Sequence, residues 1–144
     1  MRAVVTRVSK ASVKIDGVVT GKIDGGFLVL LGIKTGDTPA DAKKLAAKIC
    51  NLRVFRDADD KMNLDLKAAG GSILVISQFT LYADTSSRRP GFTEAARPDV
   101  AIPLYELFMQ ECRDLGFVVE AGVFGAMMDV YSVNDGPVTI IIES

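Results

Sequence analysis

The sequence predicts an α+β fold: an antiparallel sheet or barrel-like core of short strands, with about two helices packed outside it. Two observations carry this prediction. Most apolar residues fall in short alternating or continuous runs that suit strands, whereas two longer segments show helical spacing. No repeat, linker or low-complexity stretch divides the chain, and its 144 residues can bury one core. We therefore expect residues 1–144 to form a single domain.

The predicted strands are bounded by glycine-rich turns. Asp16-Gly17 is a hairpin signal, and Asp24-Gly25-Gly26 marks a second turn before the apolar run Phe27–Leu31, which reads as a fully buried strand. The other predicted strands are Arg2–Val8, Ala11–Ile15, Val18–Ile23, Val54–Phe55, Ser72–Gln78, Val118–Val123, Ala126–Val133 and Val138–Ile142.

Two helices are predicted from capping signals and apolar spacing. Thr38 is placed as an N-cap and Pro39 at the first helical position of a helix that runs to about Leu52. The second helix lies between Pro98 and Leu115, where Gly116 closes it. Pro103 either kinks the first turn of that helix or marks its true start.

Composition excludes several kinds of active site. The chain has no histidine, so Ser-His-Asp and Cys-His catalysis and any histidine-containing metal site are excluded. Cys50 and Cys112 are far apart in the sequence and are expected to be reduced core thiols. We expect neither a metal nor a cofactor, so an enzyme built on this chain works by positioning, backbone donors or the substrate's own groups.

Charge and hydropathy indicate where the protein acts. The net charge of −1 gives no sign of bulk nucleic-acid binding, so any such contact rests on a local patch. No apolar run reaches the length of a membrane span, and the first residues lack the apolar stretch of a signal peptide. We expect a cytoplasmic protein with no membrane partner.

The Gly136-Pro137 step joins the last two predicted strands. Proline has no N–H to give to a sheet, and glycine leaves the backbone open to an approaching ligand. The step can therefore present two carbonyls, those of Gly136 and Pro137, to something other than a strand. Taken alone, the segment is better explained as a tight turn in a terminal hairpin.

A second candidate segment follows the predicted strand Ser72–Gln78, where the apolar run ends at Ser77-Gln78-Phe79-Thr80. Backbone N–H groups of Phe79 and Thr80 could cradle an oxyanion. The ordinary alternative is that the hydroxyls of Ser77 and Thr80 only satisfy local backbone groups.

These two segments together resemble the paired signatures of the D-aminoacyl-tRNA deacylases, also called D-tyrosyl-tRNA(Tyr) deacylases. The signatures are Ser77-Gln78-Phe79-Thr80-Leu81 and Asn134-Asp135-Gly136-Pro137-Val138-Thr139. Thr6 departs from the family pattern, because many members have glutamine there. Further similar segments are Arg7–Val13, Lys61–Asn63, Arg88–Phe92, Leu104–Tyr105 and Phe124–Met128.

The resemblance implies a homodimeric hydrolase that binds the acceptor end of tRNA. It would cleave the ester bond of D-aminoacyl-tRNA and release the free D-amino acid and tRNA, a proofreading step in translation quality control. A cis Gly136–Pro137 bond of one subunit would enter the partner's active site, where its carbonyls reject L-aminoacyl-tRNA by a clash. Glycine would escape this filter, so glycyl-tRNA mischarged on alanine tRNA is an expected second substrate.

The resemblance also gives roles to single residues. Ser77 and Gln78 would position the ribose or adenine of the terminal nucleotide. Thr80 would supply a nucleophile or polarise water, or be mainly structural while the substrate's 2′-OH activates water and loop N–H groups hold the oxyanion. The lack of histidine favours the second version.

Other residues are carried over as supports of the substrate site. Arg7 would hold the Gly-Pro loop, with a surface strand arginine as the alternative; Phe124 and Met128 would line the substrate pocket. Arg88 and Arg89 could touch tRNA phosphates, with a solvated loop as the alternative. Two other functions stay open: a non-catalytic module that binds RNA ends or a protein, and a related deacylase with altered chirality.

Overall fold

Strand β1 (Arg2–Ile15) organises the fold because it pairs antiparallel with three other strands. The structure is a computed structural model that describes residues 1–144. Strand β2 (Val18–Ile23) pairs with the second half of β1, β3 (Gly26–Gly32) with its first half, and β8 (Asp129–Glu143) runs along its length.

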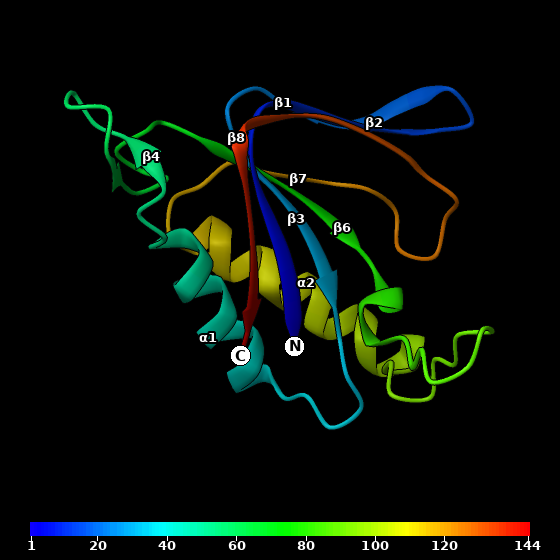
Figure 1. Ribbon diagram of the computed structural model, residues 1–144. Helices are drawn as coiled ribbons and strands as arrows, with labels where there is room; N and C mark the ends of the chain where they lie inside the picture. Colours follow the sequence, from blue (N-terminus) through cyan, green and yellow to red (C-terminus); the bar gives the residue numbers. More distant parts are fainter.

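The sheet continues past β3 in parallel pairings. Strand β6 (Ser72–Ser77) lies parallel to β3, and β7 (Val119–Ala121) lies parallel to β6, which gives the order β2-β1-β3-β6-β7 with β8 on β1. The sheet is therefore mixed rather than purely antiparallel. Strands β4 (Phe55–Arg56) and β5 (Met62–Leu64) form a separate small hairpin that projects from the body (Figure 1).

Helices α1 (Pro39–Cys50) and α2 (Pro98–Asp114) pack side by side against one face of the curled sheet (Figure 1). A short 3-10 helix, η1 (Phe79–Tyr82), follows β6 directly. Neither α-helix has the length and hydropathy of a membrane-crossing helix. The predicted fold class, a barrel-like sheet with two packed helices in one domain, is confirmed.

Alternate residues of the inner strands enter two different apolar clusters. On β6, Ile73 and Val75 face the helices, whereas Leu74 and Ile76 pack on the opposite side, inside the curl of the sheet. Because both faces of this strand are buried, it reads in the sequence as a continuous apolar run.

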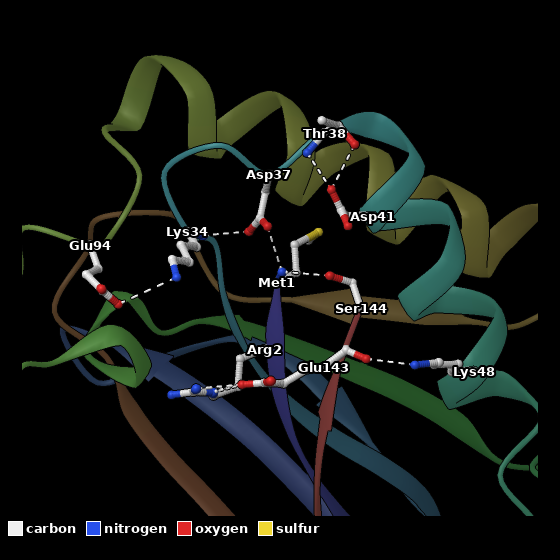
Figure 2. A network of polar contacts seen from close by, with 10 residues as sticks. All are labelled: Met1, Arg2, Lys34, Asp37, Thr38, Asp41, Lys48, Glu94, Glu143 and Ser144. Atoms are coloured by element: carbon white, nitrogen blue, oxygen red, sulfur yellow. Dashed lines mark hydrogen bonds and ion pairs between the residues drawn. The ribbon is translucent and has the colours of Figure 1, made fainter.

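The two chain ends meet in a polar network (Figure 2). The α-ammonium of Met1 lies 2.8 Å from Asp37 Oδ1 and donates to Ser144 Oγ at 2.9 Å. Lys48 on α1 donates to the main-chain carbonyl of Glu143 at 2.8 Å. These contacts fasten the first and last strands to α1 and to the loop before it.

Two predicted strand breaks were wrong. The chain between Val8 and Ala11 continues as a strand paired with β8. The two predicted N-terminal strands are therefore one strand, β1. Likewise, the last two predicted strands are one strand, β8, which bends at the Gly-Pro step. The predicted range of the second helix is confirmed: α2 starts at Pro98 and continues through Pro103, which excludes Pro103 as its start.

Candidate active site

A pocket of about 420 Å³ lies where β3 and β6 end, beside η1 and the start of α2. One wall is polar and consists of Ser77, Gln78 and Thr80, with the ring of Phe79 among them. Every other lining residue is apolar or glycine, and none is titratable: Leu31, Ile33, Ile76, Ala96, Ala101, Phe124, Gly125, Ala126, Met127, Met128 and Val130.

The polar wall exists because the chain leaves the sheet abruptly at Ser77. The N–H of Gln78 donates to the carbonyl of Leu31 at 2.8 Å, and the chain then coils into η1. Gly32 allows this close approach, because a Cβ at that position would lie 3.1 Å from Gln78 O and 3.0 Å from Leu81 Cβ. The end of β3 therefore packs directly under the 3-10 turn.

Within this wall the donors are arranged around Thr80. The Gln78 amide Nε2 donates to Thr80 Oγ1 at 2.5 Å, which leaves the Thr80 hydroxyl proton free to donate elsewhere. The N–H groups of Phe79 and Thr80 stand in the first turn of η1, where the helix has no acceptor for them, and neither donates to a neighbouring loop. The wall thus offers several donors and no base.

The opposite wall is held from behind by α2. The ring of Phe124 meets the ring of Tyr105 edge-on at a centroid distance of 5.9 Å. The buried Tyr105 hydroxyl donates to the carbonyl of Val75 on β6 at 3.0 Å, and burial raises its pKa to about 12. Met128 packs on the cluster inside the sheet curl, while Met127 at the rim is 90% exposed.

The Gly136-Pro137 step lies outside this pocket. It is an exposed bend in β8, its peptide bond is cis, and neither residue lines the pocket of its own chain. The hairpin interpretation was wrong, because the strand halves on either side of the bend both pair with β1 and not with each other. A proline at this bend costs little, since the ladder to β1 already shifts register there.

Side chains on both sides of the bend fix its shape. Asn134 Oδ1 accepts the N–H of Val138 at 2.8 Å, and Asn134 Nδ2 donates to Thr139 Oγ1 at 3.0 Å. Thus the polar residues of the second signature segment bond to one another across the bend.

Arg7 supports the bend from beneath and is only 2% exposed. Its Nε donates to the carbonyl of Asp135 at 2.8 Å, and its Nη1 donates to the carbonyl of Val54 at 2.5 Å. The alternative of a surface strand arginine was therefore wrong. Its place two residues after Val5 on a strand with a buried face is the signal for burial.

The structure brings together most of the predicted site residues but divides them into two groups. One group lines the pocket: Ser77, Gln78, Phe79, Thr80, Phe124 and Met128. In the other group, Gly136 and Pro137 form the bend and Arg7 supports it. Sequence reasoning missed Tyr105 as the support of Phe124, because a tyrosine in the apolar stripe of a helix is ordinarily read as core. No group of three or more His, Cys, Asp or Glu side chains lies close enough together to hold a metal ion.

Comparison with known proteins points to one family. The family model for D-Tyr-tRNA(Tyr) deacylase matches residues 4–143. A D-aminoacyl-tRNA deacylase from Roseiflexus castenholzii is 57% identical, covering 100% of this chain and 92% of the relative. One from Thermus aquaticus is also 57% identical, covering 100% and 95%.

Solved structures agree in fold. The c-Myc DNA unwinding element binding protein superimposes with a TM-score of 0.95 at 38% identity, covering 100% of this chain and 99% of that one. A eukaryotic protein described as a probable D-amino acid tRNA deacylase has a TM-score of 0.84 at 15% identity, covering 99% and 98%, and so shares the fold. The chain therefore belongs to the D-Tyr-tRNA(Tyr) deacylase family of hydrolases.

Proposed function

We propose that this protein hydrolyses the ester bond of D-aminoacyl-tRNA in the cytoplasm, releasing the D-amino acid and tRNA. One observation carries the proposal: the pocket combines a wall of hydrogen-bond donors with apolar surroundings and contains no titratable group. Such a site suits an already reactive ester, whose hydrolysis needs an oxyanion held in place and a positioned water more than a strong base.

In the polar wall, backbone N–H groups and side chains have different roles. The N–H groups of Phe79 and Thr80 face the position of the developing oxyanion, while Ser77 and Gln78 hold the terminal ribose or adenine. Thr80 is a poor nucleophile here, because its hydroxyl contacts the Gln78 amide and no base lines the pocket. The substrate's 2′-OH then activates the water, and Thr80 has a structural role.

The chiral filter comes from a second copy of the chain. Gly136 and Pro137 are exposed and do not line their own pocket, so their carbonyls are available to a partner subunit. Exposed apolar side chains lie along the segment that leads to the bend, as expected of a surface covered by a homodimer partner. They are Val118, Val123, Met127, Val130, Tyr131 and Val133.

Selection by backbone carbonyls explains the expected substrate range. Rigid main-chain atoms near the α-carbon reject the L configuration by a clash and make no demand on the side chain. Glycine has no side chain to clash, so glycyl-tRNA mischarged on alanine tRNA is hydrolysed as well. Arg7 and Asn134 keep the carbonyls fixed by bonding on either side of them.

The activity is tested by charging one tRNA with D-tyrosine or L-tyrosine and measuring the free amino acid released. We expect rapid release of D-tyrosine and glycine, with L-tyrosyl-tRNA left intact. Cleavage of neither tyrosyl ester would instead indicate the non-catalytic RNA-end or protein-binding module. Preferred cleavage of L esters would indicate a deacylase of altered chirality.

The shared site is tested with two defective variants. Pro137→Ala damages the filter, so that L substrates enter or activity is lost, and Ala126→Trp fills the pocket. If each site takes its pocket from one subunit and its bend from the other, co-refolded mixed dimers regain one intact site with normal D selectivity. Mixtures that stay as defective as the separate variants would exclude a site shared between subunits, and so would a monomer in sedimentation.

A further inference from the structure

Two neighbouring arginines, Arg88 and Arg89, differ from every other arginine of the chain. Both are exposed, and neither guanidinium makes a hydrogen bond or an ion pair with the protein. The guanidinium groups of all the others are engaged by carboxylates, amides or main-chain carbonyls; these are Arg2, Arg7, Arg53, Arg56, Arg97 and Arg113. Arg88 and Arg89 are thus two adjacent cations on the surface with no anionic partner in the protein.

The loop that carries Arg88 and Arg89 begins at Asp84 and ends at Gly91. These two end residues exchange backbone hydrogen bonds of 2.8 and 2.9 Å, which join the two ends of the loop at its base. Within the loop, the Asp84 carboxylate accepts the N–H of Ser86 at 2.9 Å, a contact that lowers the pKa of Asp84. The Ser87 hydroxyl donates to the carbonyl of Arg89 at 2.6 Å. The backbone at the tip is therefore ordered before any ligand arrives, which reduces the entropy cost of binding.

The base of this loop is attached to the rim of the pocket. The ring of Phe92 meets the ring of Phe79 edge-on at 5.0 Å, and Phe79 lines the pocket. Two peptide units separate Arg89 from Gly91, so its Cα lies within about 8 Å of the anchored base. In Figure 1 the loop projects from the molecule just beyond η1.

The acidic groups around the loop do not neutralise the two arginines. Glu94 pairs with Lys34 at 3.8 Å, and Asp99 pairs with Arg97 at 3.7 Å. Asp84, as described, is engaged with the loop backbone and makes no ion pair. The Asp84 carboxylate keeps its own charge, so residues 84–91 carry a net charge of +1. An anion that reaches the pocket rim therefore meets net positive charge and two unpaired guanidinium forks of the geometry that suits phosphate oxygens.

We propose that Arg88 and Arg89 bind backbone phosphates of the single-stranded 3′ end of the RNA whose terminal ester occupies the pocket. This proposal rests on the hydrolase function argued above. A single-stranded end must thread past the rim to reach the pocket, so its phosphodiesters are the anions delivered to this loop. Phosphate contacts of this kind position the strand without reading its sequence.

The kinetic test compares two substrates in three proteins. The variant Arg88→Ala/Arg89→Ala is measured against wild type and against Lys43→Ala/Lys44→Ala, which removes the same charge from an exposed face of α1. With D-tyrosyl-tRNA we expect a roughly tenfold rise in KM for the arginine variant only, from the loss of two charged hydrogen-bonding groups. With D-tyrosyl-adenosine, which has no internucleotide phosphate, all three proteins should agree within about twofold.

The salt dependence gives an independent readout. Removing two phosphate contacts to a single strand should reduce the slope of log KM against log salt by about 1.4. Arg88→Lys/Arg89→Lys should keep the wild-type slope, since it keeps the charge. Unchanged KM on tRNA in the alanine variant would overturn the proposal, as would an equal loss on both substrates.

Binding of uncharged RNA separates this proposal from the catalytic one. Fluorescence anisotropy is measured with an RNA hairpin that ends in a single-stranded 3′ tail and with a blunt hairpin of the same stem. Tighter binding of the tailed RNA, lost in Arg88→Ala/Arg89→Ala, supports the proposal even if no ester is cleaved. Equal affinity for the two RNAs, or for the two proteins, would refute it even if the enzyme is active.

Discussion

At the scale of single residues, the most informative position is Arg7, a buried cation that contacts two main-chain carbonyls. A buried guanidinium is tolerated only when its donors are satisfied, and here the acceptors are the carbonyls of Val54 and Asp135. The carboxylate of Asp135 is 3.5 Å away and half exposed, so it contributes little beyond its backbone. Arg7 therefore joins β1, the loop before β4 and the bend of β8.

Substituting Arg7 by lysine tests this role. Lysine keeps the charge but cannot reach two carbonyls in fixed directions, so we expect the free energy of unfolding to fall by about 2–3 kcal/mol. Urea denaturation of the two proteins measures the difference. Asp135→Asn is the matched control and should change stability by less than about 1 kcal/mol. A larger effect of Asp135→Asn than of Arg7→Lys would show that the ion pair, not the carbonyl contacts, holds the bend.

At the scale of elements, local sequence signals predicted individual helices and turns better than they predicted how the strands connect and pair. Thr38 and Pro39 set the start of α1, where Asp41 Oδ2 accepts the N–H of Thr38 at 2.8 Å, and Asp16-Gly17 set the turn before β2. The bend of β8 was not predictable in this way. Gly136-Pro137 breaks a strand equally well at a hairpin or at a bulge, and only pairing with β1 along both halves distinguishes them.

Helix α2 offers a test at this scale, because Pro103 lies inside it. Proline there lacks the N–H that would reach the carbonyl of Asp99, and its ring crowds that turn. Its side chain is exposed, so no core packing is lost on replacement. Pro103→Ala should therefore stabilise the protein by about 1–3 kcal/mol, with the gain reduced by the greater freedom of the unfolded chain.

The control for that variant is Pro98→Ala, at the first helical position, where proline is well placed. Chemical denaturation should show Pro98→Ala to be neutral or slightly destabilising. If Pro103→Ala were no more stable than wild type, the turn around Pro103 would already be relaxed by other contacts.

At the scale of the whole molecule, direct side-chain contacts connect the wall of the pocket to the core. Phe124 in the pocket wall rests on Tyr105 of α2, and the Tyr105 hydroxyl is bonded to Val75 in the middle of β6. Local signals predicted both helices and the main strands. The signature segments Ser77–Leu81 and Asn134–Thr139 were both expected to meet ligand, and Ser77, Gln78, Phe79 and Thr80 of the first line the pocket. They did not show that the pocket and the Gly-Pro bend are separate in one chain, because that depends on the path of β8 along β1.

This coupling predicts how stability depends on alkaline pH. Burial raises the pKa of Tyr105 from its ordinary value of 10.0 to about 12 in the folded protein. A group with a raised folded pKa stabilises the fold fully below its unfolded pKa, and the contribution is lost as pH rises through the folded value. The free energy of unfolding should therefore fall between pH 10 and 12, with Tyr105 contributing roughly 2–3 kcal/mol of that loss.

Tyr105→Phe, which lacks the hydroxyl, should show a correspondingly shallower decline of the free energy of unfolding when urea titrations are repeated at each pH. Identical declines in the two proteins would mean that the pKa of Tyr105 is the same in the folded and unfolded states, which would contradict the effect of its burial.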